Sequence, residues 1–514
     1  MAERIHITTA IFYCNAAPHI GSAYEALAAD VFARYQRRKH GRANVSFLSG
    51  TDEHGDKIYR AAVAQGLEPK SFTDKMSRLF RDAWTGLNVS FDYFVRTTDP
   101  VHEKFVQQML ARTHERGDIY FKDYEGLYCV GCERFYTEKE LLSGSVCPEH
   151  NRPVELISEG NYFLNLEKYR SAVLEHIERN PDFIRPERYR NEALKMLAEP
   201  LGDLCISRPK SRLSWGIELP FDTNYVTYVW YDALFAYVST PATENPAFLS
   251  DIWPNTQHFI GKDILKTHAV YWPPILLAAG LPLFRHLNVH GYLIFGGQRM
   301  SKSSGNVLDP VSYETAFGPD VLRYFVMRDM VYGLDGEFSE EKLIARYNAD
   351  LANDLGNLMS RVLSMAARYF QSEVKATPGP VEQTDRRMVE AFASLRARVG
   401  DMVDALAFNR ALEAIWQALD SANKYIVDTA PFTLVKDPSN LPRVAQILAN
   451  LLEGLRLAAD VLEPFMPVTA AKILDLLAVD ETIAGAPFGQ GIKVGHRIKP
   501  PVPLFPRIEK PKKS

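Results

Sequence analysis

The stretch Ile5–His40, IHITTAIFYCNAAPHIGSAYEALAADVFARYQRRKH, carries the pattern that decides the fold. It opens with a β-rich run from Ile5 to Tyr13, which the segment Asn15-Ala16-Ala17-Pro18 interrupts. Up to about His40, apolar or aromatic residues then recur four apart, at Ala23, Leu27, Val31 and Tyr35, which indicates one stripe of a helix. A strand followed by a short break and a helix is the start of a βαβ unit.

The alternation of strands and helices continues beyond this stretch. Val45–Leu48 and Tyr93–Val95 predict two more strands, and apolar spacing after the second predicts a helix that carries Val101, Phe105 and Met109. From about Gly117 to Thr223 the alternation is lost, and it resumes in the runs Tyr225–Trp230, His258–Gly261 and Leu287–His290. We therefore expect an α/β fold with a Rossmann-type parallel sheet, split by an insertion.

The last third of the sequence predicts helices. One stripe with i, i+3, i+4 spacing comprises Phe408, Ala411, Leu412, Ile415, Leu419 and Ala422. A second comprises Val444, Ile447, Leu448, Leu451, Leu455, Ala458 and Leu462. Such stripes are typical of antiparallel helices in an all-α bundle. We expect a loop at Ser372–Gln383 and a poorly anchored Pro- and Lys-rich tail from Pro500 to Ser514.

Composition excludes several classes of protein. The chain has 514 residues, of which 46% are hydrophobic and 24% charged, as in an ordinary globular protein of about three domains. A net charge of -4 means that any nucleic acid must be held by local patches. No apolar run reaches the roughly 20 residues that cross a bilayer, the first residues lack a signal-peptide layout, and five cysteines do not form an even disulfide framework. We expect a cytoplasmic protein with no membrane contact.

Two short segments carry the chemistry. Pro18-His19-Ile20-Gly21-Ser22 lies where the first strand turns into the first helix, and the free N–H groups at a helix start suit a phosphate. Gly21 would let a ligand lie against the backbone, and His19 could donate to phosphoryl oxygens as charge builds up. The second segment, Gly296–Asn306, places Arg299 and Lys302 among small residues, as in a loop that closes on a polyphosphate. Each segment alone would also fit a surface histidine or a solvated basic loop.

Together the two segments resemble the His-Ile-Gly-His and Lys-Met-Ser-Lys-Ser signatures of class I aminoacyl-tRNA synthetases. The resemblance implies that an amino-acid carboxylate attacks the α-phosphate of ATP and that magnesium-bound pyrophosphate leaves. It assigns transition-state stabilisation to His19, pyrophosphate neutralisation to Lys302, and ATP contacts to Gly21 and Arg299. Two positions depart from these signatures. Ser22 replaces a histidine but keeps a hydrogen-bond donor, and Arg299 replaces a lysine.

Within this class, the resemblance is closest to the methionyl-tRNA synthetase family and covers nearly the whole chain. It rests on the runs Ile11–His19, Gly50–Gly55, Tyr228–Leu234 and Phe259–Asp263. It implies a methionine pocket formed by Ile11, Tyr13, Trp230, Ala233, Leu234, Tyr237 and His268, with Asp52 on the substrate ammonium. A thioether suits such an apolar, aromatic slot, and Tyr237 or His268 could donate to its sulfur.

The resemblance also implies further ATP contacts. Gly261 and Asp263 would lie near the ribose, Glu218 near the adenosine and Arg208 near the phosphates, where it would assist catalysis with His19, Ser22 and Lys302. Arg208 ends the segment Cys205-Ile206-Ser207-Arg208, and the family usually has aspartate in place of Cys205.

A zinc knuckle is predicted from spacing. Cys129 and Cys132 are separated by two residues, and Cys147 and His150 repeat that spacing after a gap of fourteen. Four nitrogen and sulfur ligands close a tetrahedral shell, which predicts one structural Zn²⁺ rather than a catalytic ion. The alternative is three reduced cysteines and a chance histidine. Related synthetases carry one or two knuckles, and this chain has ligands for one, the single-knuckle bacterial type.

The resemblance places the tRNA anticodon against the helical domain. Asn357 and Arg361 are four apart on a predicted helix and so share a face, and Phe432 follows Ala430-Pro431 where the family stacks an aromatic ring on a base. A helix-surface pair and a core phenylalanine would be the ordinary alternative.

We therefore expect a methionine–tRNA ligase that acts on initiator and elongator tRNA(Met). The expected domains are two halves of a catalytic domain (1–116 and 226–297), a connective insertion (117–225), a signature-loop and stem-contact region (298–352) and an anticodon-binding domain (353–514). Because the sequence ends just past the helical bundle, we expect a monomer. The rivals are a cysteine-specific synthetase, which would hold zinc at the substrate thiol, and a non-catalytic tRNA-binding paralogue, which would have lost His19 or Lys302.

Overall fold

The computed structural model describes residues 3–129, 134–136, 138–143, 145–148, 151–296, 298–299 and 308–508. The chain divides into two compact units. The first unit comprises Met1–Thr85 and Val89–Gly291, and the second unit comprises Gly86–Asn88 and Tyr292–Ser514. No helix of the described residues is long and apolar enough to cross a membrane.

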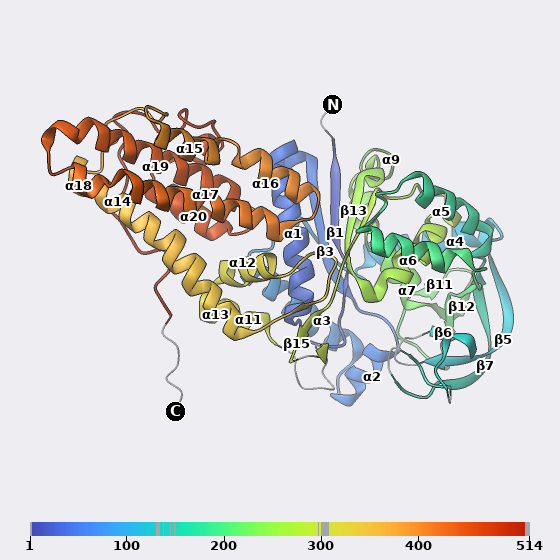
Figure 1. The fold of residues 1–514 in the computed structure, drawn as a ribbon. Coiled ribbons are helices and arrows are strands. Elements are labelled where there is room, and N and C mark those ends of the chain that lie inside the picture. Colours follow the sequence, from blue (N-terminus) through green and yellow to red (C-terminus); the bar gives the residue numbers. More distant parts are fainter. Residues whose placement is uncertain are drawn as a thin grey trace. The chain divides into compact units, whose positions relative to one another are not determined.

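A seven-stranded parallel sheet forms the centre of the first unit, in the order β2-β3-β1-β13-β14-β8, with β4 also paired to β3. Its strands are β1 (Ile5–Thr9), β2 (Phe12–Tyr13), β3 (Val45–Asp52), β4 (Tyr93–Arg96), β8 (Ile184–Arg185), β13 (Thr256–Gly261) and β14 (His286–His290). Figure 1 shows β1, β3 and β13 side by side. Every residue of β1, β13 and β14 is buried, as expected for a parallel sheet covered by helices. The predicted parallel α/β fold is confirmed.

Helices of the first unit connect and cover these strands. They are α1 (Ile20–His40), α2 (Asp56–Ala64), α3 (Pro69–Gly86), α4 (Pro100–Glu115), α5 (Glu167–Arg179), α6 (Glu187–Ala198), α7 (Val229–Phe235), α8 (Ser239–Glu244), α9 (Phe248–Asp251), the π-helix η5 (Thr267–Tyr271) and α10 (Trp272–Ala278). Three of the four residues of the predicted stripe are buried in α1, and the fourth, Tyr35, is partly exposed. α4 buries Phe105 and Met109, but Val101 in its first turn is 43% exposed, so the predicted stripe begins one turn too early.

The interruption of the alternation is more complex than one insertion. β5 (Ile119–Cys129), β6 (Arg134–Tyr136), β7 (Glu155–Leu164) and β9 (Leu204–Cys205) form an antiparallel sheet. β8 nevertheless returns to the parallel sheet and pairs with β14 through Ile184 and Arg185. A two-residue strand is too short to show a period, which is why the sequence pattern missed it.

The run Tyr225–Trp230 is not a strand of the parallel sheet, and that expectation was wrong. β12 (Asp222–Thr227) pairs antiparallel with β10 (Ser207–Pro209) and β11 (Glu218–Leu219), and Val229 already begins α7. An apolar run of this length fits a strand of either kind or a buried helix, so its partner had to come from the tertiary structure.

The second unit is mainly helical. A small sheet joins β16 (Gln298–Arg299), β15 (Leu293–Phe295) and β17 (Gly336–Glu337). The helices are α11 (Pro310–Phe317), α12 (Pro319–Asp329), α13 (Glu340–Arg346), the π-helix η7 (Tyr347–Gly356), α14 (Asn357–Phe370), α15 (Gln383–Ala393), α16 (Leu395–Asp404), α17 (Phe408–Thr429), α18 (Pro431–Leu434), α19 (Leu441–Leu462), α20 (Pro467–Leu476) and α21 (Glu481–Ala484). Both predicted stripes are buried in full, and α14, α17 and α20 pack against α19 (Figure 1). The predicted helical bundle is confirmed.

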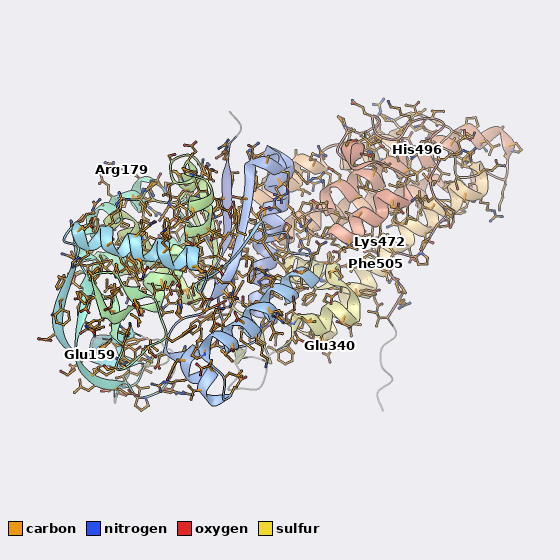
Figure 2. All side chains as sticks on the ribbon, turned by 180° about the vertical axis from the view of Figure 1, so that it is seen from behind. Glu159, Arg179, Glu340, Lys472, His496 and Phe505 are labelled. Atoms are coloured by element: carbon orange, nitrogen blue, oxygen red, sulfur yellow. The ribbon has the colours of Figure 1, made fainter. Side chains whose placement is uncertain are left out.

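The C-terminal segment up to Ile508 is anchored, contrary to expectation. The Tyr347 hydroxyl donates to the Pro506 carbonyl at 2.8 Å, and the Asn348 amide exchanges two hydrogen bonds with the Ile508 backbone. His496 Nε2 lies 2.7 Å from the Leu477 carbonyl oxygen, and the Phe505 ring packs edge-on against Tyr347. His496 and Phe505 are labelled in Figure 2. These side-chain-to-backbone bonds do not depend on sequence composition, which explains why a Pro- and Lys-rich segment can be ordered.

Candidate active site

His19 caps the N-terminus of α1 with its own side chain. Its Nδ1 accepts a hydrogen bond from the Ser22 backbone N–H at 3.2 Å, and the His19 backbone N–H donates to Ser22 Oγ at 3.0 Å. The Ser22 hydroxyl in turn donates to the His19 carbonyl at 2.7 Å. This is a capping box in which serine takes the N3 position. Because Nδ1 is an acceptor, a neutral His19 ring carries its hydrogen on Nε2, which is the atom able to donate to a phosphate.

Gly21 provides the space for that imidazole. A Cβ built on Gly21 would lie 2.9 Å from both Cε1 and Nδ1 of His19, closer than real Cβ contacts. The sequence suggested that Gly21 lets a ligand approach the backbone. The structure gives a nearer reason, since the glycine is required by the capping geometry of His19 itself.

At the ends of β13 and β14, Asp263 and His290 lie close to Glu25 of α1. Gly261 ends β13, and a Cβ on it would meet Asp263 Oδ1 at 2.5 Å. Glu25 of α1 accepts from the Ala10 backbone N–H at 2.8 Å and faces His290 Nε2 at 3.1 Å. Burial raises the pKa of Glu25, whereas His290 keeps a raised pKa because Glu25 outweighs the effect of burial. Ligands of open α/β sheets bind at the carboxyl ends of the strands, where these residues lie.

Glu25 and His290 were not predicted from the sequence. Glu25 is the one charged residue of the run from Ala23 to Ala29, and a carboxylate at a buried helical position is a signal of a partner. His290, however, is 265 positions away, and no local pattern names it as that partner.

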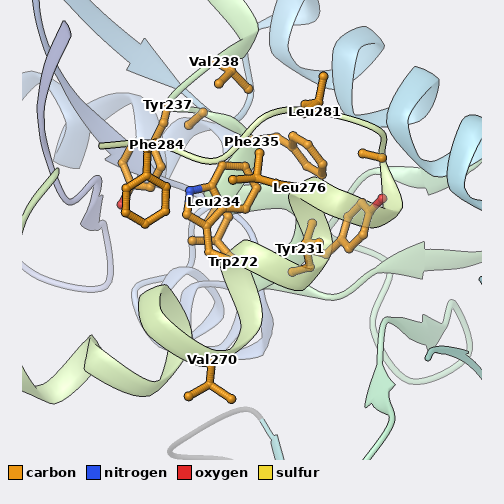
Figure 3. Packing of buried hydrophobic residues seen from close by; sticks show 14 of the residues in the cluster. Tyr231, Leu234, Phe235, Tyr237, Val238, Val270, Trp272, Leu276, Leu281 and Phe284 are labelled. Atoms are coloured by element: carbon orange, nitrogen blue, oxygen red, sulfur yellow. The ribbon is translucent and has the colours of Figure 1, made fainter. Parts of the chain in front are cut away.

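The residues predicted for methionine meet in one apolar cluster. Ile11, Ala233, Leu234 and Tyr237 are buried members of the same core, and Tyr13 and Trp230 pack against it. Figure 3 shows Leu234 and Tyr237 packed with other members of this cluster, such as Phe235 and Trp272. Asp52 is the register partner of Tyr13 between β2 and β3, and it is 5% exposed. A carboxylate therefore lies beside a residue that packs against the apolar cluster, a position that suits an amino-acid ammonium.

Tyr237 and His268 are hydrogen-bonded to each other. His268 Nδ1 donates to the Ile264 carbonyl at 2.9 Å, so its Nε2 accepts from the Tyr237 hydroxyl at 2.8 Å. Burial lowers the pKa of His268 to about 4, which keeps the ring neutral near pH 7. His268 lies in the π-helix η5, a geometry that is common at functional sites. In this arrangement both donors of the pair are used internally, whereas the sequence had suggested them as donors to a thioether.

Arg208 and Glu218 lie in the small antiparallel sheet of β10, β11 and β12. The Arg208 guanidinium is 4% exposed, donates to the Ser207 carbonyl at 2.6 Å and to Cys205 Sγ at 3.4 Å, and stacks on Tyr128 and Tyr228. It lines a hollow with Gly55, Asp56, Tyr128, Arg212 and Tyr228. Glu218 is exposed on β11 and binds Lys210 Nζ at 2.5 Å.

Two of the four predicted zinc ligands are described. Cys129, at the end of β5, and Cys147 are both buried in a small cluster with Tyr136, and the Cys147 thiol lies 3.5 Å from the Tyr136 hydroxyl. Cys132 and His150 lie outside the described residues, as does Lys302, and the Arg299 side chain is likewise not described.

In the second unit, the predicted anticodon residues are at the surface. Asn357 and Arg361 are exposed on one face of α14, directly after the π-helix η7. Phe432, in α18, is 50% exposed, so it is not a core phenylalanine. An exposed amide, guanidinium and aromatic ring are the groups that single-stranded bases require.

Comparison with known proteins first gives the class. A family model described as tRNA synthetases class I (M) matches residues 5–155 and 140–363. A second model, the anticodon binding domain of methionyl tRNA ligase, matches residues 376–514. The fold, the site and these matches define a class I aminoacyl-tRNA synthetase.

Individual relatives give the member of that class. The chain is 42% identical to the methionine–tRNA ligase of Caldanaerobacter subterraneus, with 99% of this chain and 80% of the relative covered, and 40% identical to that of Nostoc sp., with 98% and 97% covered. A structure of Mycobacterium tuberculosis methionyl-tRNA synthetase with methionyl-adenylate has a TM-score of 0.93 and 41% identity over 98% of this chain and 100% of that one. The chain belongs to the methionyl-tRNA synthetase family and is an ATP-dependent ligase that joins methionine to tRNA.

Proposed function

We propose that the first unit performs methionine activation with the residues described above. Asp52 binds the ammonium, and the cluster of Ile11, Ala233, Leu234 and Tyr237 holds the thioether. The carboxylate attacks the α-phosphate of ATP, which gives methionyl-adenylate and pyrophosphate. Methionine then passes to the terminal adenosine of tRNA, and AMP is released.

His19 carries the transition-state role in this proposal. The capping box holds its ring so that Nε2–H can donate as charge develops on the phosphoryl oxygens. A donor held in place before the reaction needs no reorganisation during it. Gly21, Gly261 and Asp263 hold the nucleotide, and Arg208, Arg299 and Lys302 supply positive charge for the phosphates. Mg²⁺ enters with ATP as its counter-ion.

The observation that carries the proposal is the placement of Asp52 beside a closed apolar cluster. The test is ATP–pyrophosphate exchange with each amino acid in turn. We expect exchange with methionine to be fastest. Faster exchange with cysteine, or none with methionine, would overturn the proposal.

We also propose one structural Zn²⁺, held by Cys129, Cys132, Cys147 and His150. Two buried thiols from separate segments already share one small cluster with little apolar material of its own, which fits a tetrahedral ion that braces it. Metal analysis of the purified protein should give about one zinc per chain, and Cys147→Ser should lower that content and expose residues 119–164 to proteases. A wild-type protein with no zinc would contradict this.

For the tRNA partner, we propose that Asn357, Arg361 and Phe432 read the anticodon of initiator and elongator tRNA(Met). We propose further that the protein acts as a monomer in the cytoplasm. Sedimentation at several protein concentrations tests whether the protein is a monomer, because a dimer in equilibrium with monomers would show a concentration-dependent mass.

A further inference from the structure

The first unit contains a series of buried polar side chains that are hydrogen-bonded to one another, the chain His54–Asp232–His102–Ser239. None of these four residues has been given a role so far. The two carboxylate oxygens of Asp232 each meet an imidazole, at 2.6 Å from His54 Nδ1 and 2.6 Å from His102 Nε2. His102 Nδ1 continues to the Ser239 hydroxyl at 2.9 Å. All four residues are at most 4% exposed.

These hydrogen bonds join three helices and the segment that follows β3. His54 follows the end of β3, His102 lies in α4, Asp232 in α7 and Ser239 at the start of α8. The bonds to Asp232 span 178 and 130 positions of sequence. Because the two bonds leave the carboxylate by different oxygens, they fix α7 against both β3 and α4.

The central carboxylate is ionised. Burial by itself would raise the pKa of Asp232, but His54 and His102 outweigh it and lower the pKa. Burial would lower the pKa of His54, and Asp232 reverses that effect. Both ring nitrogens that face Asp232 therefore donate to it. Such charge-assisted bonds are short and strong, and breaking one partner of a buried set costs far more than a surface pair.

Both ends of the His54–Asp232 hydrogen bond lie close in sequence to residues proposed for the methionine site. Asp52 lies two residues before His54, and the intervening Glu53 is fixed by a bidentate bond to Arg96 at 2.7 Å. On the other side, Asp232 stands between Trp230 and Ala233 in α7, a helix of only seven residues whose first turn has no side-chain cap. A helix this short has little rigidity of its own, so its register depends on contacts such as these.

We propose that Asp232 is a positioning residue for methionine, which acts through His54 and His102 to set the distance between the Asp52 carboxylate and the α7 side chains. The inference rests on the proposed function, which assigns Asp52 and Trp230 to the substrate. A slot whose ends are held at a fixed separation binds one length of amino acid, so the chain contributes to methionine affinity rather than to ATP affinity.

The test is Asp232→Asn, which keeps the size of the side chain but leaves one imidazole N–H facing an amide N–H. In ATP–pyrophosphate exchange we expect the KM for methionine to rise about tenfold or more, with the KM for ATP within about twofold of wild type. Equal increases in both KM values, or an unchanged KM for methionine, would overturn the inference.

A matched pair at His102 keeps the inference testable if Asp232→Asn does not fold. Gln can place an amide donor near the position of Nε2, whereas Leu has similar bulk and no donor. We expect His102→Gln to stay within about threefold of the wild-type KM for methionine and His102→Leu to resemble Asp232→Asn. A purely structural role would predict that these variants differ in unfolding temperature but not in the ratio of the two KM values.

The outcome is distinct from a failure of the proposed function. If the wild-type protein shows no methionine-dependent exchange, the proposed function fails. If the wild type exchanges with methionine and Asp232→Asn has the same KM for methionine, only the positioning role of Asp232 fails.

Discussion

At the scale of single residues, the start of α1 shows how a departure from a family signature can be absorbed. Ser22 replaces an imidazole, yet its backbone N–H and hydroxyl make three hydrogen bonds with His19. The small side chain completes a local motif that needs only an oxygen at N3. His19, Gly21 and Ser22 therefore act as one structural group.

Gly21→Ala should slow the chemistry without unfolding the protein. The added Cβ would push the His19 ring out of place, and a displacement of about 1 Å can cost up to about 100-fold in rate. The free energy of unfolding should change by no more than about 1 kcal/mol, since alanine favours a helix over glycine. ATP–pyrophosphate exchange and urea unfolding measure the two quantities.

The control is the double variant His19→Ala with Gly21→Ala. If the glycine acts only through the imidazole, the double variant should be no slower than His19→Ala alone. A further loss of rate in the double variant would show that Gly21 also contacts the ligand.

Ser22→Ala should lower stability by about 0.5–2 kcal/mol, the usual value for a lost cap side chain, and Ser22→Thr should restore most of it. Thermal unfolding of the three proteins measures this. Equal stability of all three would mean that the capping box contributes nothing.

At the scale of elements, the N-terminus of α15 is the clearest case of local structure held by distant residues. Asp385 accepts from the Val381 and Glu382 backbone N–H groups and from both terminal nitrogens of Arg443 at 2.8 Å, and the Tyr425 hydroxyl adds a further bond. The loop before α15 is thereby attached to α17 and α19. The sequence predicted the loop at Ser372–Gln383, but not what holds it.

This arrangement predicts a pH dependence of stability. Burial would raise the pKa of Asp385, but its partners lower it to about 2, from an ordinary 3.8. A depressed pKa stabilises the fold above the unfolded-state value, by about 2 kcal/mol here, and this contribution is lost as the pH falls from about 4 towards 2. In urea unfolding at pH 7, the wild type should therefore have a larger free energy of unfolding than Asp385→Asn. The difference between the two free energies should shrink below pH 4. A difference that does not depend on pH would contradict this assignment.

At the scale of the whole molecule, the proposed methionine residues and the proposed anticodon residues belong to different units. The described residues that we propose for methionine belong to the first unit, whereas Arg299 in β16 and the exposed Asn357, Arg361 and Phe432 belong to the second. Effects on tRNA recognition should therefore not appear in the activation step.

Asn357→Ala and Arg361→Ala should each lower kcat/KM for tRNA aminoacylation by about tenfold or more, because a good base contact contributes about 1–3 kcal/mol. Methionine-dependent ATP–pyrophosphate exchange should stay at the wild-type rate. Lys472→Ala removes an exposed cation from α20 and is the control for a general loss of charge. If Lys472→Ala weakens aminoacylation equally, the α14 pair has no specific role.

Most of the long elements and the family could be predicted from the sequence. The period of α1, the strand runs of β3, β13 and β14 and the stripes of α17 and α19 follow from local spacing, and the signature segments are contiguous. The tertiary structure alone decided that β12 joins a separate antiparallel sheet, that β8 returns to the parallel one, and that Glu25 meets His290. It also decided that Asp232 lies between His54 and His102. Each of these pairings joins residues that are distant in sequence, and local periodicity contains no information about which buried polar group will face which other.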